Sequence, residues 1–220
     1  MTQSPQSDAG ATPATTAASA APAADRPLRV AVLVGSVRAG RVGPAVADWF
    51  TALAAARPDL EVDVVDVAEA TEHLPLDLSG FRGPYGLDPA TAPEVTGRLA
   101  AADAFVVVTA EYNHSFPAGL KNLIDWHYTE WQAKPVGFVS YGGVGGGIRA
   151  VEALRVVFPE LHAMTVRDAV SLHGPWNHLD DNGLPRELAV CESAAKNMLD
   201  QLTWWGHALR TARDTRPYGS

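Results

Sequence analysis

Apolar and polar positions along residues 28–212 follow two alternating patterns, one typical of buried strands and one typical of amphipathic helices. Runs rich in β-branched residues, which predict strands, lie at 28–35, 60–67, 104–110 and 134–142, with a weaker one at 163–170. Segments with apolar residues at helical spacing lie at 44–56, 91–102, 117–130, 147–158 and 187–212. This alternation predicts right-handed βαβ crossovers and a parallel sheet with helices on both faces.

Five parallel strands in one sheet suit a three-layer, flavodoxin-like α/β fold, in which the strand order is 2-1-3-4-5. Residues 60–67 alternate in polarity, which favours a strand near the edge of the sheet. In this order, ligands bind beyond the carboxyl ends of the strands, at the switch point between the first and third strands. We therefore expect the loops after Val34, Thr109 and Ser140 to converge on one crevice.

Residues 28–212 are predicted to form one domain between two tails. Residues 1–27 are almost entirely Ala, Thr, Ser, Pro and Gln, so they have little to bury and are expected to be disordered. Residues 213–220 are expected to be a flexible C-terminus. The chain shows neither the basic start and apolar core of a signal peptide nor the run of about 20 apolar residues that spans a membrane. We expect a cytoplasmic protein with no membrane partner.

Charge and cysteine content exclude several classes of function. The net charge is −8 without a basic block, which argues against a nucleic-acid partner. Cys191 is the only cysteine and no two histidines have ligand spacing on one helix, so no disulfide and no metal site are predicted. His-Glu-x-x-His and Gly-x-Ser-x-Gly do not occur, so zinc-peptidase and α/β-hydrolase chemistry are not indicated.

The loop after the first strand, GSVRAGRVGPA at 35–45, has the composition of a phosphate cradle. Its glycines allow tight turns, Ser36 supplies a hydroxyl, and Arg38 and Arg41 supply positive charge. The loop also leads into a predicted helix, and the unpaired backbone amides and the dipole at the start of a helix favour binding of an anion. It matches neither the Walker pattern nor Gly-x-Gly-x-x-Gly. Taken by itself, it is explained equally well as an ordinary glycine-rich turn with two solvated arginines.

The loop after the third strand, AEYNHS at 110–115, carries five consecutive polar residues. We expect His114 or Ser115 to be the N-cap of the next helix and Pro117 to lie in its first turn. A cap needs only one such residue. The others are predicted to bind a ligand.

The loop after the fourth strand begins SYGGVGGG at 140–147 and has five glycines in six positions. Such a loop lets the backbone approach a ligand closely, at a cost in chain entropy. Tyr141 can present its ring or its hydroxyl to that ligand, although a flexible surface loop remains an alternative. Together the three loops suit a ligand with a phosphate at one end and a flat, hydrogen-bonding body at the other. FMN fits this description, and fits the crevice better than a dinucleotide.

At the motifs GSVRAGRVG, AEYNHSFPAGLKNLIDW and YGGVGGG the chain resembles the NADPH-dependent FMN reductase family, the flavodoxin-like quinone, azo and chromate reductases. The resemblance extends over about residues 28–170. It implies that Ser36 and Arg38 contact the phosphate, helped by backbone amides around Val42. Many members have Ser and Asn where this chain has Arg41 and Gly43.

The resemblance also places residues around the flavin ring. Glu111, Tyr112 and Asn113 would lie along its N5 and O4 edge, after Ala110 in place of the family's usual proline. Residues 140–143 would meet its pyrimidine end. The residues expected to bind the cofactor are Ser36, Arg38, Arg41, Val42, Gly43, Ala110, Glu111, Tyr112, Asn113, Ser140, Tyr141, Gly142 and Gly143.

The implied activity is hydride transfer from NADPH or NADH to FMN, followed by two-electron reduction of a small-molecule acceptor: a quinone, free flavin, azo compound or similar molecule. The cofactor carries this chemistry, so no catalytic side chain is named, and Glu111 is expected to shape its loop. Two alternatives stay open. One is a flavodoxin-like electron carrier that binds FMN without oxidising NADPH, and the other is a cofactor-free regulatory domain on the same fold.

Two further segments stand out. Aromatic side chains are concentrated in WHYTEW at 126–131 and TWW at 203–205, which indicates an interface, and the resemblance implies a homodimer or homotetramer.

Residues 73–94 form a long link rich in Pro and Gly, of a length typical of a lid or wall over a site.

Overall fold

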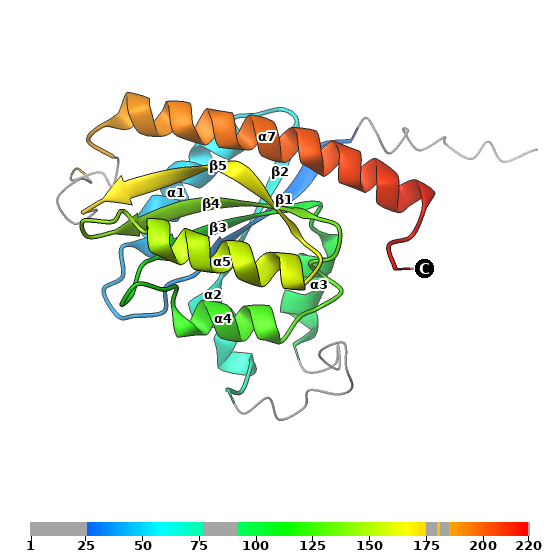
Figure 1. The fold of residues 1–220 in the computed structure, drawn as a ribbon, viewed down its shortest axis with the longest axis horizontal. Helices are drawn as coiled ribbons and strands as arrows, with labels where there is room; N and C mark the ends of the chain where they lie inside the picture. The colour runs from blue at the N-terminus through cyan, green and yellow to red at the C-terminus, as the bar shows by residue number, and fades with distance from the viewer. Residues whose placement is uncertain (1–25, 77–91, 175–179, 181–184, 220) are drawn as a thin grey trace, which may run out of the picture.

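The computed structural model describes residues 26–76, 92–174, 180 and 185–219. Five strands form one parallel sheet in the order β2-β1-β3-β4-β5 (Figure 1). The strands are β1 (Leu28–Val34), β2 (Leu60–Asp66), β3 (Ala104–Ala110), β4 (Pro135–Gly142) and β5 (Met164–His173). The helical segments are α1 (Gly43–Ala55), α2 (Val67–Ala70), the 3-10 turn η2 (Thr71–His73), α3 (Pro93–Ala101), α4 (Ala118–Asp125), α5 (Ile148–Glu160) and α7 (Leu188–Thr215). The predicted fold class and strand order are confirmed.

The strands differ in burial as their sequences predict. Every residue of β3 and of β4 is buried, because both strands lie inside the sheet and are covered on both faces. Strand β2 forms one edge of the sheet, as predicted, but its burial does not alternate strictly: only Leu60 and Val65 are buried, and its other positions are half-buried or exposed. The central strands therefore place the ends of β1, β3 and β4 side by side, where the three unusual loops begin.

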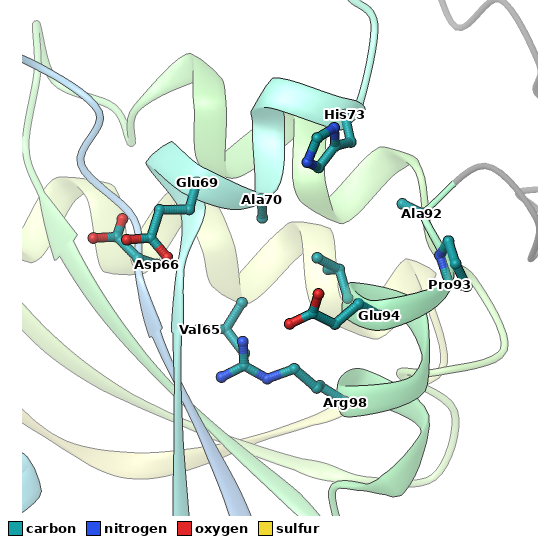
Figure 2. Close-up of a pocket in the computed structure, with 10 residues that line it drawn as sticks. Val65, Asp66, Glu69, Ala70, His73, Ala92, Pro93, Glu94 and Arg98 are labelled. Atoms are coloured by element: carbon teal, nitrogen blue, oxygen red, sulfur yellow. The ribbon is translucent and has the colours of Figure 1, made fainter.

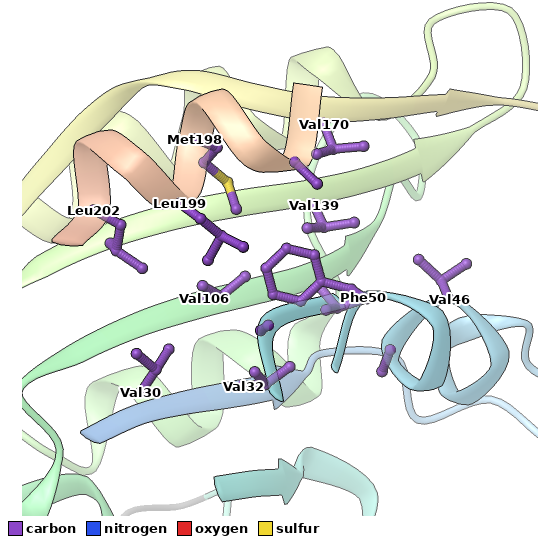
Figure 3. Close-up of a cluster of buried hydrophobic side chains, with 14 of the residues drawn as sticks. Val30, Val32, Val46, Phe50, Val106, Val139, Val170, Met198, Leu199 and Leu202 are labelled. Atoms are coloured by element: carbon purple, nitrogen blue, oxygen red, sulfur yellow. The ribbon is translucent and has the colours of Figure 1, made fainter. Parts of the chain in front are cut away.

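Helices cover the sheet in two layers. Helices α1 and α7 pack on one face and α3, α4 and α5 on the other (Figure 1). Figure 3 shows the first layer, where Phe50 of α1 lies over Val106 of the sheet with Leu199 of α7 beside it. All three side chains are buried. Burying a side chain of this size contributes about 1.5–3 kcal/mol, so the layer holds α1, and with it the loop that opens α1, in a fixed place.

Helix α4 is shorter than predicted. It ends at Asp125, whereas the pattern predicted a helix to residue 130. The cause is a tertiary contact: Trp131 turns back into the core, and its indole Nε1 donates to the carbonyl oxygens of Ile124 and His127 at 3.3 and 2.9 Å. These bonds satisfy carbonyls at the end of the helix. Trp126 and Trp131 are both fully buried, so the prediction that their indoles belong to an interface is wrong.

The same turn fixes a buried histidine, His127. Its Nδ1 lies 2.8 Å from the Leu123 carbonyl oxygen, which can only accept, so Nδ1 carries the proton. Its Nε2 then accepts from the Thr96 hydroxyl at 3.2 Å. Burial lowers the pKa of His127, in keeping with a neutral ring.

The last strand and last helix are longer than predicted. Strand β5 runs to His173, and its register against β4 shifts between Val136 and Phe138. Helix α7 runs to Thr215 rather than 212.

Ion pairs and hydrogen bonds connect the residues just before β1 to helix α7. The buried carboxylate of Asp103 accepts from Arg26 at 2.9 Å and from Arg210 at 3.3 Å, and Arg210 also donates to the carbonyl oxygens of Arg26 and Pro27. Arg26 and Pro27 had been assigned to the disordered tail; residues 1–25 of that tail lie outside the described residues. So do residues 77–91, most of the predicted lid. No helix in the described ranges is long and apolar enough to cross a membrane.

Candidate functional site

The loops that leave β1, β3 and β4 meet at one end of the sheet, at the left of Figure 1. The amide of Gly35 donates to Val108 of β3 at 2.8 Å, and the amide of Glu111 donates to Tyr141 of β4 at 2.9 Å. These bonds continue the ladder to the point where each loop begins. The predicted convergence is therefore confirmed for the backbone, and the predicted site residues on the three loops are neighbours.

The first loop and strand β4 each place one hydroxyl beside the start of α1. Ser36 is fully buried, and a Cβ atom at Gly43 would overlap its Oγ and lie 2.8 Å from Oη of Tyr141. Only glycine fits there. Helix α1 has no side-chain N-cap and no acidic residue in its first turn, so its first backbone amides and dipole are free to favour an anion.

The two arginines of this loop have different partners. Arg41 forms a bidentate ion pair with Asp66 at 2.7 and 2.5 Å and donates to the Ser36 carbonyl at 2.7 Å. Its guanidinium therefore ties the loop to the end of β2, and contact between Arg41 and a phosphate stays a prediction. Arg38 is exposed, and its guanidinium lies 3.6 Å above the centre of the Tyr112 ring. A ring face does not use up N–H donors, so this stacking leaves Arg38 able to bind an anion.

The second loop is a tight turn rather than a helix cap. Tyr112 and Ser115 exchange backbone hydrogen bonds at 2.8 and 3.1 Å, and the two residues between them, Asn113 and His114, have φ of 51° and 70°. Positive φ at both central positions is the signature of a type I′ turn. The N-cap of α4 is Pro117, without a side-chain bond, so the prediction that His114 or Ser115 caps this helix is wrong.

Glu111 joins the second loop to the third. Its carboxylate accepts from the backbone amide of Arg149 at 3.2 Å and from Arg149 Nε at 2.5 Å, and Arg149 Nη1 lies 3.0 Å from His114 Nε2. The Glu111 side chain is 6% exposed and that of Arg149 is 44% exposed. The ion pair holds the two loops together at the start of α5.

The third loop uses its glycines in two ways. Gly147 has φ of 87°, and a Cβ there would lie 2.7 Å from the amide nitrogen of Tyr141, so it lets the loop pack on the end of β4. Around Gly143, by contrast, a Cβ would have no heavy atom within 4 Å, so this part of the backbone is open to a ligand. The Ser140 hydroxyl is used inside the loop, where it donates to the Gly146 carbonyl at 2.9 Å.

Tyr141 points away from the open part of its loop. Its side chain is 5% exposed and packs in the same apolar cluster as Val34 and Val139, on the α1 side of the sheet. Burial raises its pKa to about 12, and the neighbouring Ser36 hydroxyl offsets only part of this rise. The phenol is therefore a proton donor throughout the physiological range.

The sequence model of the NADPH-dependent FMN reductase family matches residues 28–177. The chain belongs to this family. An NAD(P)H-dependent FMN reductase of Schizosaccharomyces pombe is 35% identical over 155 residues, which are 64% of this chain and 76% of the relative. A quinone reductase of Escherichia coli K12 is 34% identical over 144 residues, 63% and 73% of the two chains. The flavoenzyme FerB, an NAD(P)H:(acceptor) oxidoreductase from Paracoccus denitrificans, shares the fold with a TM-score of 0.62 at 23% identity, covering 82% of this chain and 98% of that one.

Family membership makes the chain an oxidoreductase that uses FMN and NAD(P)H, and its own residues fit the cofactor. Among the described residues, Ser36 Oγ and Tyr141 Oη are buried and have no hydrogen-bond partner. Both lie beside the uncapped N-terminus of α1, where the 5′-phosphate of FMN would supply an acceptor. The open backbone at Gly143 suits the approach of a flat ring.

A separate pocket lies beside the crevice that the three loops form. It has a volume of about 410 Å³ and is lined mainly by residues of β2, α2 and α3, including Asp66, Glu69, Glu94 and Arg98 (Figure 2). The predicted cofactor-binding residues do not line it, and Asp66 links it to them through its ion pair with Arg41. In the ranges that the structure describes, no group of three or more His, Cys, Asp or Glu is placed to hold a metal ion.

Proposed function

We propose that this family member passes two electrons from NADPH or NADH, through FMN, to a quinone or a similar small molecule. The observation that carries the proposal is a pair of buried hydroxyls, without hydrogen bonds of ordinary geometry to the described residues, at the uncapped start of α1 in a chain of the FMN reductase family. Relatives named quinone reductase and 2-hydroxy-1,4-benzoquinone reductase support a quinone as the acceptor.

The residues of the chain bind and orient, and the bound flavin supplies the hydride chemistry. The backbone amides at the start of α1, Ser36 and Arg38 would hold the phosphate. The turn at residues 112–115 would lie along the ring edge, and the ion pair between Glu111 and Arg149 ties this loop to the start of α5. The Glu111 carboxylate is held in the ion pair with Arg149, and burial raises the pKa of Tyr141 to about 12. The proposed reaction assigns no proton transfer to either side chain, because the flavin carries the chemistry.

We also propose that the chain forms a homodimer or homotetramer through α7. Trp204 and Trp205 are 64% and 38% exposed, with ring centres 4.8 Å apart. Exposed indoles of this kind are enriched at protein interfaces. Light scattering combined with size-exclusion chromatography tests the proposal, because a mass of one chain, 23.3 kDa, would contradict it. A Trp204→Lys variant is expected to shift the mass toward the monomer.

Steady-state kinetics test the proposed activity. With FMN-loaded protein, NADPH or NADH oxidation is expected to rise with the concentration of a benzoquinone and to show the ping-pong pattern of two substrates that share one site. An electron carrier would bind FMN but leave both nicotinamides unoxidised. A cofactor-free regulatory domain would bind no FMN in titration.

A further inference from the structure

Tyr141 and Ser36 come from different strands and meet at one point. Tyr141 lies near the end of β4, and Ser36 lies in the loop that follows β1. Both hydroxyl oxygens lie where a side chain on Gly43, the first residue of α1, would begin, because a Cβ atom there would overlap both of them. The phenol therefore lies at the end of the crevice where the phosphate would bind, whereas the rest of the loop after β4 lines a different side of the crevice.

Neither hydroxyl makes a hydrogen bond of ordinary geometry within the described residues, although the two lie close enough for the Ser36 hydroxyl to lower the pKa of Tyr141. Buried polar groups without partners cost free energy, and native structures usually supply one from protein, water or ligand. Trp49 Nε1 and Thr51 Oγ1 are also without partners, but they lie in the body of α1. At Ser36 and Tyr141, by contrast, the unpaired atoms coincide with an uncapped helix start.

The two hydroxyls can be satisfied together by one anion. The Tyr141 phenol stays protonated and can donate to Ser36 Oγ, and Ser36 can then donate its own proton to a phosphate oxygen. A neutral donor pair suits this place because Arg41 is already bound to Asp66. If Tyr141 only filled space in the core, phenylalanine would serve as well and the hydroxyl would have no use.

We propose that Tyr141 is a positioning residue for the phosphate of FMN, acting through Ser36, and that the pair makes the site select FMN over riboflavin. This inference rests on the proposed function, since it assumes that the crevice binds FMN. It assigns to Tyr141 a place at the phosphate end rather than at the pyrimidine end of the flavin.

The test is to compare FMN with riboflavin, which has the same ring and ribityl chain but no phosphate. Binding is measured by flavin fluorescence on the full chain for Tyr141→Phe, Ser36→Ala and the double variant. We expect Tyr141→Phe to weaken FMN binding about tenfold, or about 1.4 kcal/mol, and to change riboflavin binding less than twofold. In the Ser36→Ala background, Tyr141→Phe is expected to have little further effect, because the two hydroxyls act as one unit.

Controls separate this inference from loss of the fold and from failure of the proposed function. Tyr128→Phe removes a hydroxyl that lies 3.0 Å from His162, distant from the three loops, and is expected to leave both affinities unchanged. If Tyr141→Phe loses FMN and riboflavin binding equally, or loses neither, the proposed role of Tyr141 is overturned. FMN binding by the wild type would still uphold the proposed function in that case. A wild-type chain that binds neither flavin would overturn both.

Discussion

Replacing Glu111 by Gln tests how the second and third loops are held together. The substitution keeps the shape of the side chain but removes the charge that pairs with Arg149. It weakens two charge-assisted hydrogen bonds, one to Arg149 Nε and one to the Arg149 amide, and such bonds contribute about 1.5–3 kcal/mol each where both partners are buried. Because the Arg149 side chain is 44% exposed, solvent screens the pair, and we expect a total loss of about 1–2 kcal/mol.

The loss is expected to appear in two measurements. Urea unfolding of the FMN-free protein at pH 7 should give a free energy of unfolding lower by about 1–2 kcal/mol, with an unchanged m-value. FMN and riboflavin should both bind about 5 to 30 times more weakly, because the proposed site places the loosened second loop along the ring that the two flavins share. The turnover rate at saturating FMN should fall less than about threefold, since Glu111 carries no proton in the proposed reaction.

A matched control is Glu152→Gln, which makes the same chemical change on α5 at a carboxylate that is 70% exposed and pairs with Arg155, and is expected to cost less than about 0.5 kcal/mol. Two results would refute the reasoning about Glu111. One is an unfolding free energy and flavin affinities equal to those of the wild type. The other is a turnover rate that falls a hundredfold or more with flavin bound, which would make Glu111 a general base.

Four further substitutions test other parts of the account. Asp103→Asn leaves the buried guanidinium of Arg210 without its charge partner, so the free energy of unfolding should fall by about 3–5 kcal/mol in urea while FMN affinity stays the same in protein that remains folded. Burial gives His127 a folded-state pKa below its ordinary value of 6.5, so its contribution to stability is complete above pH 6.5 and is lost as the pH falls toward the folded pKa. The variant His127→Gln should therefore flatten the dependence of Tm on pH below 6.5. An identical slope in variant and wild type would contradict this. Gly147→Ala should destabilise the protein by about 2 kcal/mol or more, because its φ of 87° disfavours a side chain and the Cβ meets backbone, whereas Gly143→Ala should change stability by less than about 0.5 kcal/mol.

The sheet could be predicted from the sequence because its signals are local. The apolar run of β3 predicts a strand buried on both faces, the polar residues within β2 predict a strand at the sheet edge, and the order of elements along the chain restricts the topology. The end of α4 could not be predicted in this way. It depends on Trp131 turning back to bond the last carbonyls, which is a tertiary contact that helical periodicity does not show.

The candidate site could be predicted as a set of loops but not as a set of contacts. The sequence supplies two arginines in the first loop, yet Arg41 is bound by Asp66, 25 residues further along and at the end of a neighbouring strand. The direction of Tyr141 did have a signal. It is two residues after Val139 in a strand, so both side chains lie on the α1 face. A signal for the turn at Asn113 was also present, since Asn tolerates positive φ, but the interpretation of its neighbours as a helix cap obscured it.

The most direct test of the central claim is the visible spectrum of the purified, FMN-loaded protein in the absence of oxygen. If the three loops form a site where a nicotinamide reduces the bound flavin, the flavin absorbance should bleach when NADPH or NADH is added and return when a quinone follows. A bound flavin that keeps its absorbance with either nicotinamide would contradict the account.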